Sequence, residues 1–428
     1  MAEAFVIQGG HSLKGEIEVS GSKNAAIPIL AATLLTKESS TITNIPLIQD
    51  ILKLIEILES LGAKIKWLDN NTIKIDPSHL SLKKINQDLV KKIRASVLLI
   101  APLTHRFSSF ELRQPGGCVI GARPIDTHLL ALEALGAKIE VFPDRYFIRR
   151  NHLHNNTVIL QEFSVTATEN VLMLASLIPG KTILKIAATE PHVEDLVIFL
   201  NKMGAKIKTI GSHVYEIEGV KRLHGAKHTL IPDTNEAGTY IIMGIALHCN
   251  LLVKNVIPEH LDLVFKKLED MGGSFLVKKR KDGLSDVQIR PSHQLKASKI
   301  QTQIYPGIPT DLQSVLGVLA TQATGSSLIF DTMFEGRLKY IDELNKMGAN
   351  AIIADPHRAV INGPTSLYGQ TINSFDIRSG AALIIAALMA QGESIITNAY
   401  QVDRGYERLD EKLQKLGANI TRKEISNS

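Results

Sequence analysis

The apolar residues of this chain follow two different helical patterns that alternate along its length. In the first, apolar residues recur at every third or fourth position, as at Ile51, Leu54, Leu58 and Leu61, which predicts a helix with one buried face. In the second, almost every position is apolar or small, which predicts a helix buried on all sides. The second pattern is found at residues 24–35, 95–103, 167–177, 237–247, 312–320 and 380–390.

A short motif of Leu or Met followed by glycine ends each amphipathic pattern. Its glycines lie 74, 68, 68, 76 and 69 residues apart, at Gly62, Gly136, Gly204, Gly272, Gly348 and Gly417. Glycine is typical of the left-handed position that terminates a helix. Alternating segments follow the motif, such as residues 64–67 and 72–75, and predict an antiparallel hairpin. The pattern therefore predicts six copies of one α/β unit of about seventy residues each.

With 428 residues, the chain is longer than a single hydrophobic core normally allows, and we expect two domains. Three units can close around a shared bundle of three buried helices, so six units predict two lobes with a cleft. The alternative is a long solenoid, but solenoid repeats are usually only about 20 to 50 residues long. Hydrophobic residues make up 44% and charged residues 21% of the chain, which predicts folding throughout.

Charge and cysteine content narrow the function classes. The 48 basic and 43 acidic residues are interleaved, so the net charge of +5 gives little support for nucleic-acid binding. Cys118 and Cys249 are too few for a disulfide framework. The first residues show no secretory signal, and the apolar stretches are shorter than the about 20 residues that a bilayer requires. We therefore expect a cytoplasmic protein that does not enter a membrane.

Polar residues concentrate near the predicted helix starts. They are Lys23, Asn24, Arg94, Ser164, Glu236, Asp311 and Arg378 at the buried helices, and Arg123, Glu190, His192, Arg337 and Arg404 before the amphipathic ones. Helix starts expose free N–H groups that attract anions, and cations are disfavoured there unless a ligand brings negative charge. The alternative is that Asp311 merely caps a helix and that the arginines lie on the surface beside acidic neighbours such as Asp376.

Cys118 lies in the most unusual segment, residues 115–124, among Gly116, Gly117 and Gly121. Three glycines predict an exposed loop, and Arg113 and Arg123 nearby favour the thiolate. Cys249 instead follows an apolar helix and is expected to be buried and inert. Cys118 is therefore a candidate reactive thiol.

Several separated motifs resemble one known family. They are Gly-Ser-Lys-Asn-Ala-Ala at 21–26, Arg-Ala-Ser at 94–96, the segment 115–126, Glu-Pro-His at 190–192, Pro-Thr-Asp-Leu-Gln at 309–313, Phe-Glu at 334–335 and Asp-Arg-Gly-Tyr-Glu-Arg at 403–408. In these motifs, and over essentially its whole length, the chain resembles the UDP-N-acetylglucosamine enolpyruvyl transferases of the enolpyruvyl transferase family. A joint match of so many motifs is far more specific than a single glycine-rich motif.

The resemblance implies an α/β fold of two lobes, each an inside-out α/β barrel of three units around buried helices, with the active site in the cleft. We place residues 1–22 and 233–428 in lobe I and residues 23–232 in lobe II. The implied reaction transfers the enolpyruvyl group of phosphoenolpyruvate to the 3′-hydroxyl of UDP-N-acetylglucosamine and releases phosphate, the first committed step of peptidoglycan synthesis. It implies no cofactor and no metal, and it leaves the oligomeric state open.

The resemblance also implies roles for individual residues. Cys118 takes the place of the general acid, which can form a covalent adduct, and Asp311 takes the place of the base; Lys23 and Arg404 complete the catalytic set. The expected phosphoenolpyruvate ligands are Lys23, Asn24, Arg123 and Arg404. The expected ligands of the nucleotide sugar are Arg94, Arg123, Pro124, Ile125, Asp126, Thr127, Ser164, Val165, Asp311 and Met333.

The chain departs from the family pattern at a few positions. They are Thr166, Thr234, Asn235, Val315 and Gln401. Most lie in or beside the expected binding loops, so a diverged relative that uses another nucleotide or nucleotide sugar is the main alternative. A catalytically silent nucleotide-sugar binding protein is a further alternative, against which the joint presence of Lys23, Cys118 and Asp311 argues.

Overall fold

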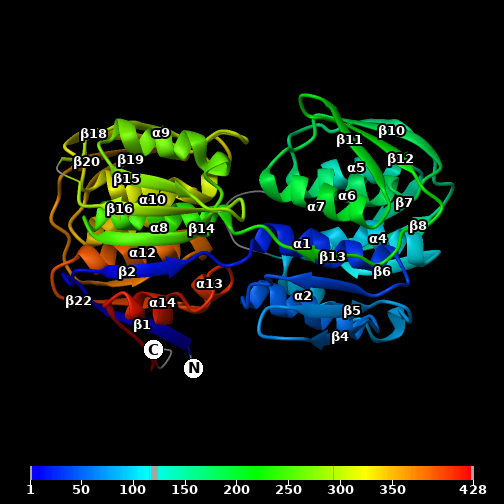
Figure 1. Cartoon of the computed structure of the whole chain (residues 1–428), viewed down its shortest axis with the longest axis horizontal. Coiled ribbons are helices and arrows are strands. Elements are labelled where there is room, and N and C mark those ends of the chain that lie inside the picture. The colour runs from blue at the N-terminus through cyan, green and yellow to red at the C-terminus, as the bar shows by residue number, and fades with distance from the viewer. Residues whose placement is uncertain (1, 115, 117–123, 293, 426–428) are drawn as a thin grey trace. The chain divides into compact units, whose positions relative to one another are not determined.

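The fold was taken from a computed structural model, in which residues 2–114, 116, 124–292 and 294–425 are described. These residues form two compact units (Figure 1). The first unit extends to Ser20 and resumes at Pro232, and the second extends from Gly21 to Ile231. Cys118 and Arg123 lie outside the described residues. In the part of the chain that is described, every helix is too short or too polar to cross a membrane.

The predicted repeat is present as a recurring succession of elements, with the edge strand replaced by a helix in one copy. A short edge strand leads to a buried helix, a second strand, an outer helix and a hairpin. One complete copy consists of β17 (Lys299–Gln301), α10 (Thr310–Ala320), β18 (Gly325–Phe330), α11 (Tyr340–Lys346), β19 (Asn350–Asp355) and β20 (Arg358–Gly363). Because the edge strand pairs in parallel with the strand after the buried helix, each helix packs across the sheet of its own copy.

The buried helices form the centre of each unit. In the first unit they are α8 (Thr234–Ala246), α10 and α12 (Ile377–Met389). In the second unit they are α1 (Lys23–Ala32), α4 (Ile100–Arg106) and α6 (Val165–Ala175), with the 3₁₀ turns η1 (Thr33–Leu35) and η3 (Arg94–Leu99). In the first unit α10 contacts both α8 and α12, so the three helices form one bundle (Figure 1).

The helix predicted at 95–103 differs from the prediction, because its first part is the 3₁₀ turn η3 and the α-helix begins only at Ile100. Pro102 explains the difference. Proline lacks an N–H group and is best accommodated in the first turn of an α-helix, so α4 starts just before it, although α1 accommodates Pro28 in its interior.

The outer helices carry the amphipathic pattern. They are α2 (Gln49–Ser60), α5 (Asp126–Glu133), α7 (Pro191–Lys202), α9 (Asp262–Asp270), α11 and α14 (Leu409–Lys415). Shorter helical segments are α3 (Gln87–Lys92), α13 (Tyr400–Asp403), η2 (Leu82–Lys84), η4 (Pro258–Leu261) and η5 (Arg337–Lys339). All six motif glycines follow the outer helices with φ between 88° and 101°, which confirms their predicted role as helix terminators.

The strands form six separate sheets rather than a continuous barrel in the described ranges. The remaining strands of the first unit are β1 (Ala2–Gln8), β2 (Lys14–Glu18), β14 (Asn250–Val256), β15 (Ser274–Lys279), β16 (Ser285–Arg290), β21 (Thr371–Asn373), β22 (Glu393–Thr397) and β23 (Asn419–Ile425). The strands of the second unit are β3 (Ser40–Thr43), β4 (Lys64–Trp67), β5 (Ile73–Asp76), β6 (Ser109–Arg113), β7 (Ala137–Val141), β8 (Arg145–Arg150), β9 (Thr157–Ile159), β10 (Gly180–Lys185), β11 (Lys206–Gly211), β12 (Val214–Gly219) and β13 (Lys227–Thr229).

Five sheets have four strands, in the orders β21-β22-β1-β23, β15-β16-β14-β2, β17-β18-β20-β19, β13-β3-β5-β4 and β11-β12-β10-β9. Two of these sheets contain the strands at which the chain passes from one unit to the other. Strand β2 precedes α1 of the second unit but pairs in parallel with β14, whereas β13 precedes α8 of the first unit but pairs in parallel with β3. Each sheet is therefore completed inside one unit, although the chain passes from one unit to the other.

The sixth sheet, β6-β8-β7, has three strands in the described part of the chain, and the short helix α3 replaces the edge strand. The side chain of Gln87 takes over the hydrogen bonds of a neighbouring strand. Its Nε2 donates to the carbonyl oxygen of Glu111 at 2.9 Å, and its Oε1 accepts from the backbone N–H of Arg113 at 3.0 Å. One amide side chain thus covers part of the exposed edge of β6.

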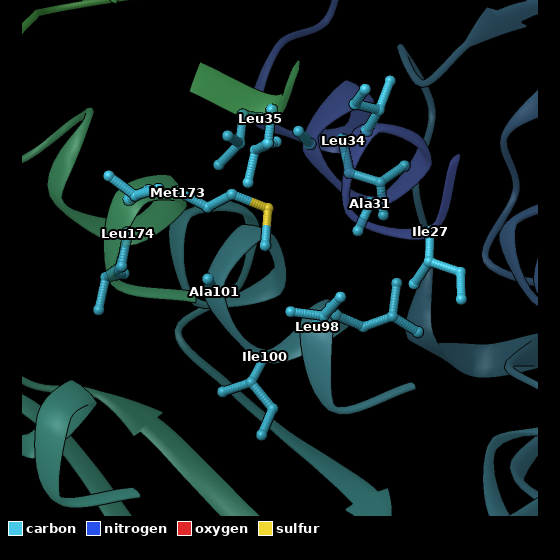
Figure 2. Close-up of a cluster of buried hydrophobic side chains, with 14 of the residues drawn as sticks. Ile27, Ala31, Leu34, Leu35, Leu98, Ile100, Ala101, Met173 and Leu174 are labelled. Atoms are coloured by element: carbon cyan, nitrogen blue, oxygen red, sulfur yellow. The ribbon is translucent and has the colours of Figure 1, made fainter. Parts of the chain in front are cut away.

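The core of the second unit joins its three buried helical segments. Figure 2 shows Ile27, Ala31 and Leu34 facing Leu98 and Ala101, with Met173 and Leu174 of α6 completing the cluster. These side chains are at most 8% exposed. Close packing of this kind explains why the buried helices carry small and apolar residues on every face.

Gly317 of α10 provides a test of the packing in the first unit. A Cβ atom there would lie 2.0 Å from the hydroxyl of the buried Tyr340, which accepts a hydrogen bond from Gln313. We expect Gly317→Ala to lower the free energy of unfolding by about 1–3 kcal/mol, although alanine is the better helix former. Urea denaturation measures this change. Gly211→Ala, where the nearest atoms lie 3.9 Å from the added Cβ, is the matched control. Equal stability of the two variants would contradict the close approach.

Candidate active site

The starts of the three buried helices of the first unit meet at Asp311, the second residue of α10. Its Oδ1 accepts from Nη2 of Arg337 at 2.6 Å, and its Oδ2 accepts from Nε of Arg378, on α12, at 3.1 Å. Nδ2 of Asn235, on α8, donates to the same Oδ2 at 3.3 Å. One carboxylate therefore organises a polar cluster at one end of the helix bundle.

Arg337 and Arg378 are buried, with 9% and 3% of each residue exposed, so the interpretation of both as surface arginines is wrong. Arg337 also lies 3.7 Å from Oδ1 of Asp376, and Arg378 stacks on the ring of Tyr406 at 5.2 Å. Although burial favours the neutral form, the charge of Asp311 raises the pKa of Arg378 above its ordinary value. Arg378 therefore remains cationic beside Asp311.

The interpretation of Asp311 as a helix cap is also wrong. The N-cap of α10 is Pro309, and no side chain caps this helix. Asp233, by contrast, is the N-cap of α8 and accepts from the backbone N–H of Glu236 at 2.9 Å. Asp311 is thus held by arginines and Asn235, rather than by the backbone of its own helix.

The same cluster contains buried donors with no hydrogen-bond partner within the described ranges. They are Nε of Arg337 and Nη1 of Arg378. A buried donor without an acceptor costs about 1–3 kcal/mol, so the cluster leaves part of the hydrogen-bonding capacity of both arginines unused. Sequence reasoning noted both arginines but gave neither a place in the site. Their position at element starts was the available signal.

Met333 is connected to this cluster through the buried Asp331. Oδ1 of Asp331 accepts from the backbone N–H of Met333 at 2.9 Å, and Oδ2 accepts from the hydroxyl of Thr310 at 2.6 Å. Because Thr310 directly precedes Asp311, Asp331 fixes both expected ligands of the nucleotide sugar in the first unit. The side chain of Met333 itself is exposed.

Arg404 directly follows α13, a helix of only four residues. Its Nη1 donates to Oε1 of Gln401 at 3.0 Å, and the residue is half-buried. The backbone that carries Arg404 therefore leaves regular secondary structure at this point. Its position depends on the contacts of the neighbouring residues.

In the second unit, Lys23 is the first residue of α1 and is buried. Its Nζ lies 2.8 Å from Oδ2 of Asp50, in the first turn of α2. The carboxylate of Asp50 offsets the unfavourable free energy of a buried positive charge at the start of a helix, where the helix dipole opposes it. Asn24 follows and is half-buried. Pro28 has no N–H group to donate to the carbonyl of Asn24, which leaves this oxygen outside the helical hydrogen-bond pattern.

Arg94 and the segment Pro124–Asp126 lie together. Nη2 of Arg94 donates to the carbonyl oxygen of Pro124 at 3.4 Å. Burial raises the pKa of Tyr146, the carboxylate of Asp126 raises it further, and Arg94 opposes both effects. Arg94 and Asp126 therefore both lie close to this phenol, while Ile125 is buried and forms the N-cap of α5.

The start of α6 is tied to the same segment. Ser164 is the N-cap and accepts from the backbone N–H of Ala167 at 3.4 Å, while Val165 begins the helix. Thr127 donates to Oε1 of Glu162 at 3.2 Å, and the hydroxyl of Thr166 lies 3.1 Å from Nε2 of the buried His128. The two expected ligand segments, 124–127 and 164–165, are thus connected through hydrogen bonds that involve the neighbouring residues Glu162, His128 and Thr166.

The structure therefore collects the expected ligands in two groups, each described within its own unit. Arg94, Pro124, Ile125, Asp126, Thr127, Ser164 and Val165 form one group in the second unit. Asp311 and Met333 belong to the other, in the first unit. Sequence reasoning missed Asn235 as a partner of Asp311, and it missed His128 and Glu162, which connect the ligand segments. In the described ranges, His, Cys, Asp and Glu side chains form no group of three or more that could hold a metal ion.

Arg113, which was expected to favour the thiolate of Cys118, is already paired. Its Nη1 lies 2.6 Å from Oδ1 of Asp88. Both side chains are exposed, so the carboxylate offsets much of the positive charge of Arg113.

Comparisons with known proteins agree with this arrangement. Residues 7–413 match the profile of the family described as EPSP synthase (3-phosphoshikimate 1-carboxyvinyltransferase). The chain is 43% identical to the UDP-N-acetylglucosamine 1-carboxyvinyltransferase of Treponema denticola, over 98% of this chain and 99% of that protein. It is also 43% identical to UDP-N-acetylglucosamine 1-carboxyvinyltransferase 1 of Symbiobacterium thermophilum, over 98% and 95% of the two chains.

Among solved structures, the chain is similar to the enolpyruvyl transferase NikO from Streptomyces tendae. The TM-score is 0.89 at 25% sequence identity, and the match covers 99% of this chain and 100% of that one. The similarity thus includes both units and every element that carries an expected ligand.

Proposed function

This chain belongs to the EPSP synthase family of 1-carboxyvinyltransferases, and we propose that it transfers the enolpyruvyl group of phosphoenolpyruvate to the 3′-hydroxyl of UDP-N-acetylglucosamine. Phosphate is the second product. The reaction is the first committed step of peptidoglycan synthesis, and the proposed compartment is the cytoplasm. The observation that carries the choice of acceptor is the near full-length similarity to relatives named for this activity.

The proposed chemistry starts with protonation of the methylene carbon of phosphoenolpyruvate by Cys118. The neighbouring carbon then becomes electrophilic and is attacked by the 3′-oxygen of the sugar, whose proton leaves to Asp311. The methyl group then returns a proton to the Cys118 thiolate while the C–O bond to phosphate breaks, which restores the double bond of the enolpyruvyl group now attached to the sugar. Fixed charges that match the developing positive charge accelerate such a step.

Asp311 fits two parts of this scheme. Its contacts with Arg337 and Arg378 hold the carboxylate in one position, so it can orient the attacking hydroxyl, accept its proton and stabilise positive charge.

In the proposed complex, Lys23, Asn24, Arg123 and Arg404 bind the phosphate and carboxylate of phosphoenolpyruvate. The nucleotide sugar is assigned to Arg94, Arg123, Pro124, Ile125, Asp126, Thr127, Ser164, Val165, Asp311 and Met333. The N-terminus of α6 supports a phosphate at Ser164 and Val165, because its first N–H groups point out of the helix.

A second candidate is the same reaction on another nucleotide or nucleotide sugar. Two contacts at the start of α6 favour it. The side chain of Thr166 occupies space beside His128. The carboxylate of Glu162 accepts a hydrogen bond from Thr127, so a diphosphate bound at Thr127 would lie near a negative charge. An unfavourable charge against one acceptor is a common source of specificity for another.

Phosphate release from phosphoenolpyruvate tests both candidates. We expect the purified chain to release phosphate with UDP-N-acetylglucosamine at a higher kcat/KM than with other UDP-sugars or with UDP and UMP. A clear preference for a different acceptor would support the second candidate. Binding of the nucleotide sugar without any phosphate release would instead indicate a silent binding protein.

A further inference from the structure

The residues on both sides of Arg404 are held by different parts of the first unit. Gly405 packs so closely on α12 that a Cβ atom would lie 2.4 Å from Cγ2 of Ile377. Tyr406 is buried, its hydroxyl lies 2.9 Å from the hydroxyl of Thr239, and its ring lies under Arg378. The backbone after Arg404 is therefore fixed by packing on α8 and α12.

The backbone before Arg404 is fixed by an arginine from the last strand. Nη1 and Nη2 of Arg422 donate to Oδ2 and Oδ1 of Asp403 at 2.8 and 2.6 Å, a bidentate pair. Nε and Nη2 of the same guanidinium donate to Oδ2 and Oδ1 of Asp410 at 2.7 and 3.0 Å. A planar guanidinium can hold two carboxylates in this way, whereas an ammonium group cannot.

Arg422 is itself rigidly placed. It lies on β23 opposite Phe5 of β1, and its guanidinium stacks on the ring of this buried residue at 4.7 Å. Hydrogen bonds with Asp403 and then Asp410 raise its pKa above the ordinary value. Asp403 is thus held in place by Arg422 on strand β23, and not only by the four-residue helix α13 that contains it.

We propose that Arg422 is a positioning residue for phosphoenolpyruvate binding, which holds Asp403 and thereby sets the direction of Arg404. The inference rests on the proposed function, in which Arg404 binds this substrate. A purely structural role, in which Arg422 only attaches β23 to α13 and α14, is the alternative. A positioning role predicts that a variant of Arg422 weakens the binding of phosphoenolpyruvate more than that of UDP-N-acetylglucosamine. A purely structural role predicts equal effects on both substrates.

Arg422→Lys keeps the positive charge and loses the double fork. We expect the KM for phosphoenolpyruvate to rise about tenfold, because small displacements of a binding group have large effects, and the KM for UDP-N-acetylglucosamine to change less than about twofold. Arg280→Lys is the matched control. Arg280 contacts the carboxylates of Asp282 and Asp286, whereas Arg422 contacts those of Asp403, Asp410 and Glu3, and Arg280 lies on the β15–β16 hairpin with no proposed role. Thermal unfolding of both variants measures how much each substitution lowers the stability of the protein.

A double-mutant cycle identifies the route of the effect. If Arg422 acts through Arg404, adding Arg422→Lys to Arg404→Gln changes the KM for phosphoenolpyruvate by less than about twofold. An additive effect, an equal rise of both KM values, or an unchanged KM in Arg422→Lys would overturn the proposal.

Binding of phosphoenolpyruvate measured by calorimetry, with no nucleotide sugar present, keeps this test separate from the proposed function. A wild-type chain that releases no phosphate would refute the proposed function alone. The calorimetric comparison of wild type with Arg422→Lys would still decide the role of Arg422, because it needs no turnover. We expect about tenfold weaker binding in the variant, and equal binding would refute the inference.

Discussion

Replacing Asp311 by asparagine is expected to reduce turnover by about two to four orders of magnitude. Asparagine has nearly the same shape but no charge, so it can neither accept the proton of the sugar hydroxyl nor stabilise positive charge on the enolpyruvyl group. Steady-state phosphate release measures the loss. Calorimetric titration with UDP-N-acetylglucosamine shows whether the acceptor still binds.

The structure adds a stability effect to this expectation. Arg378 is buried against Asp311, so the variant leaves a buried cation with a weaker partner, which typically costs about 3–5 kcal/mol when a pair is fully broken. Arg337 retains Asp376. We therefore expect a lower melting temperature together with the loss of turnover, and activity must be measured well below it.

Asp355→Asn is the matched control for Asp311→Asn. Asp355 also pairs with an arginine, since its Oδ2 accepts from Nε of Arg358 at 2.7 Å, but it lies on the β19–β20 hairpin with no proposed role. Turnover of this variant is expected to equal that of the wild type. Near-normal turnover of Asp311→Asn would refute the assignment of Asp311 to the reaction.

The second large effect concerns the thiols. We expect an epoxide that carries a phosphonate group to modify Cys118 and not Cys249, because the phosphonate resembles the phosphate of phosphoenolpyruvate and is attracted by Lys23, Arg123 and Arg404. Cys249 is only 4% exposed, and burial raises the pKa of its thiol to about 11. Its thiolate is therefore scarce and inaccessible at neutral pH. Mass spectrometry of the digested protein identifies the modified peptide.

The corresponding variants separate labelling from catalysis. Cys118→Ala is expected to lose both the adduct and at least about a hundredfold in turnover, because a general acid contributes that much or more. Cys249→Ala is the matched control and should retain both. An adduct confined to Cys249, or full turnover of Cys118→Ala, would contradict the proposed acid.

Much of the fold could be predicted because each copy of the repeat is specified by local sequence patterns. The glycine at each helix end and the difference between amphipathic and wholly apolar helices require no knowledge of distant contacts. The helix break at Pro102 was within reach of the same local rules. The replacement of an edge strand by Gln87 was not, because it depends on a contact between residues 26 positions apart.

The candidate site could be predicted only as a set of residue types at helix starts. The partners of those residues are distant in the sequence, and some come from other copies of the repeat. Arg337 and Arg378 lie 26 and 67 positions from Asp311, and only the packing of α10 with its neighbours shows that they meet. The pairing of Arg113 with Asp88 and the contact of Thr166 with His128 were hidden for the same reason.

The three-stranded sheet has a consequence for local opening. The backbone N–H of Arg113 and the carbonyl of Glu111 are held by one side chain from a six-residue helix, whereas the other edge strands hold their neighbours through a backbone ladder. Amide hydrogens held in this way exchange with solvent through low-energy local fluctuations. Strand β6 ends at Arg113, five positions before Cys118. Local opening at the end of β6 is thus governed from Gln87, a residue that touches neither substrate in the proposed complex.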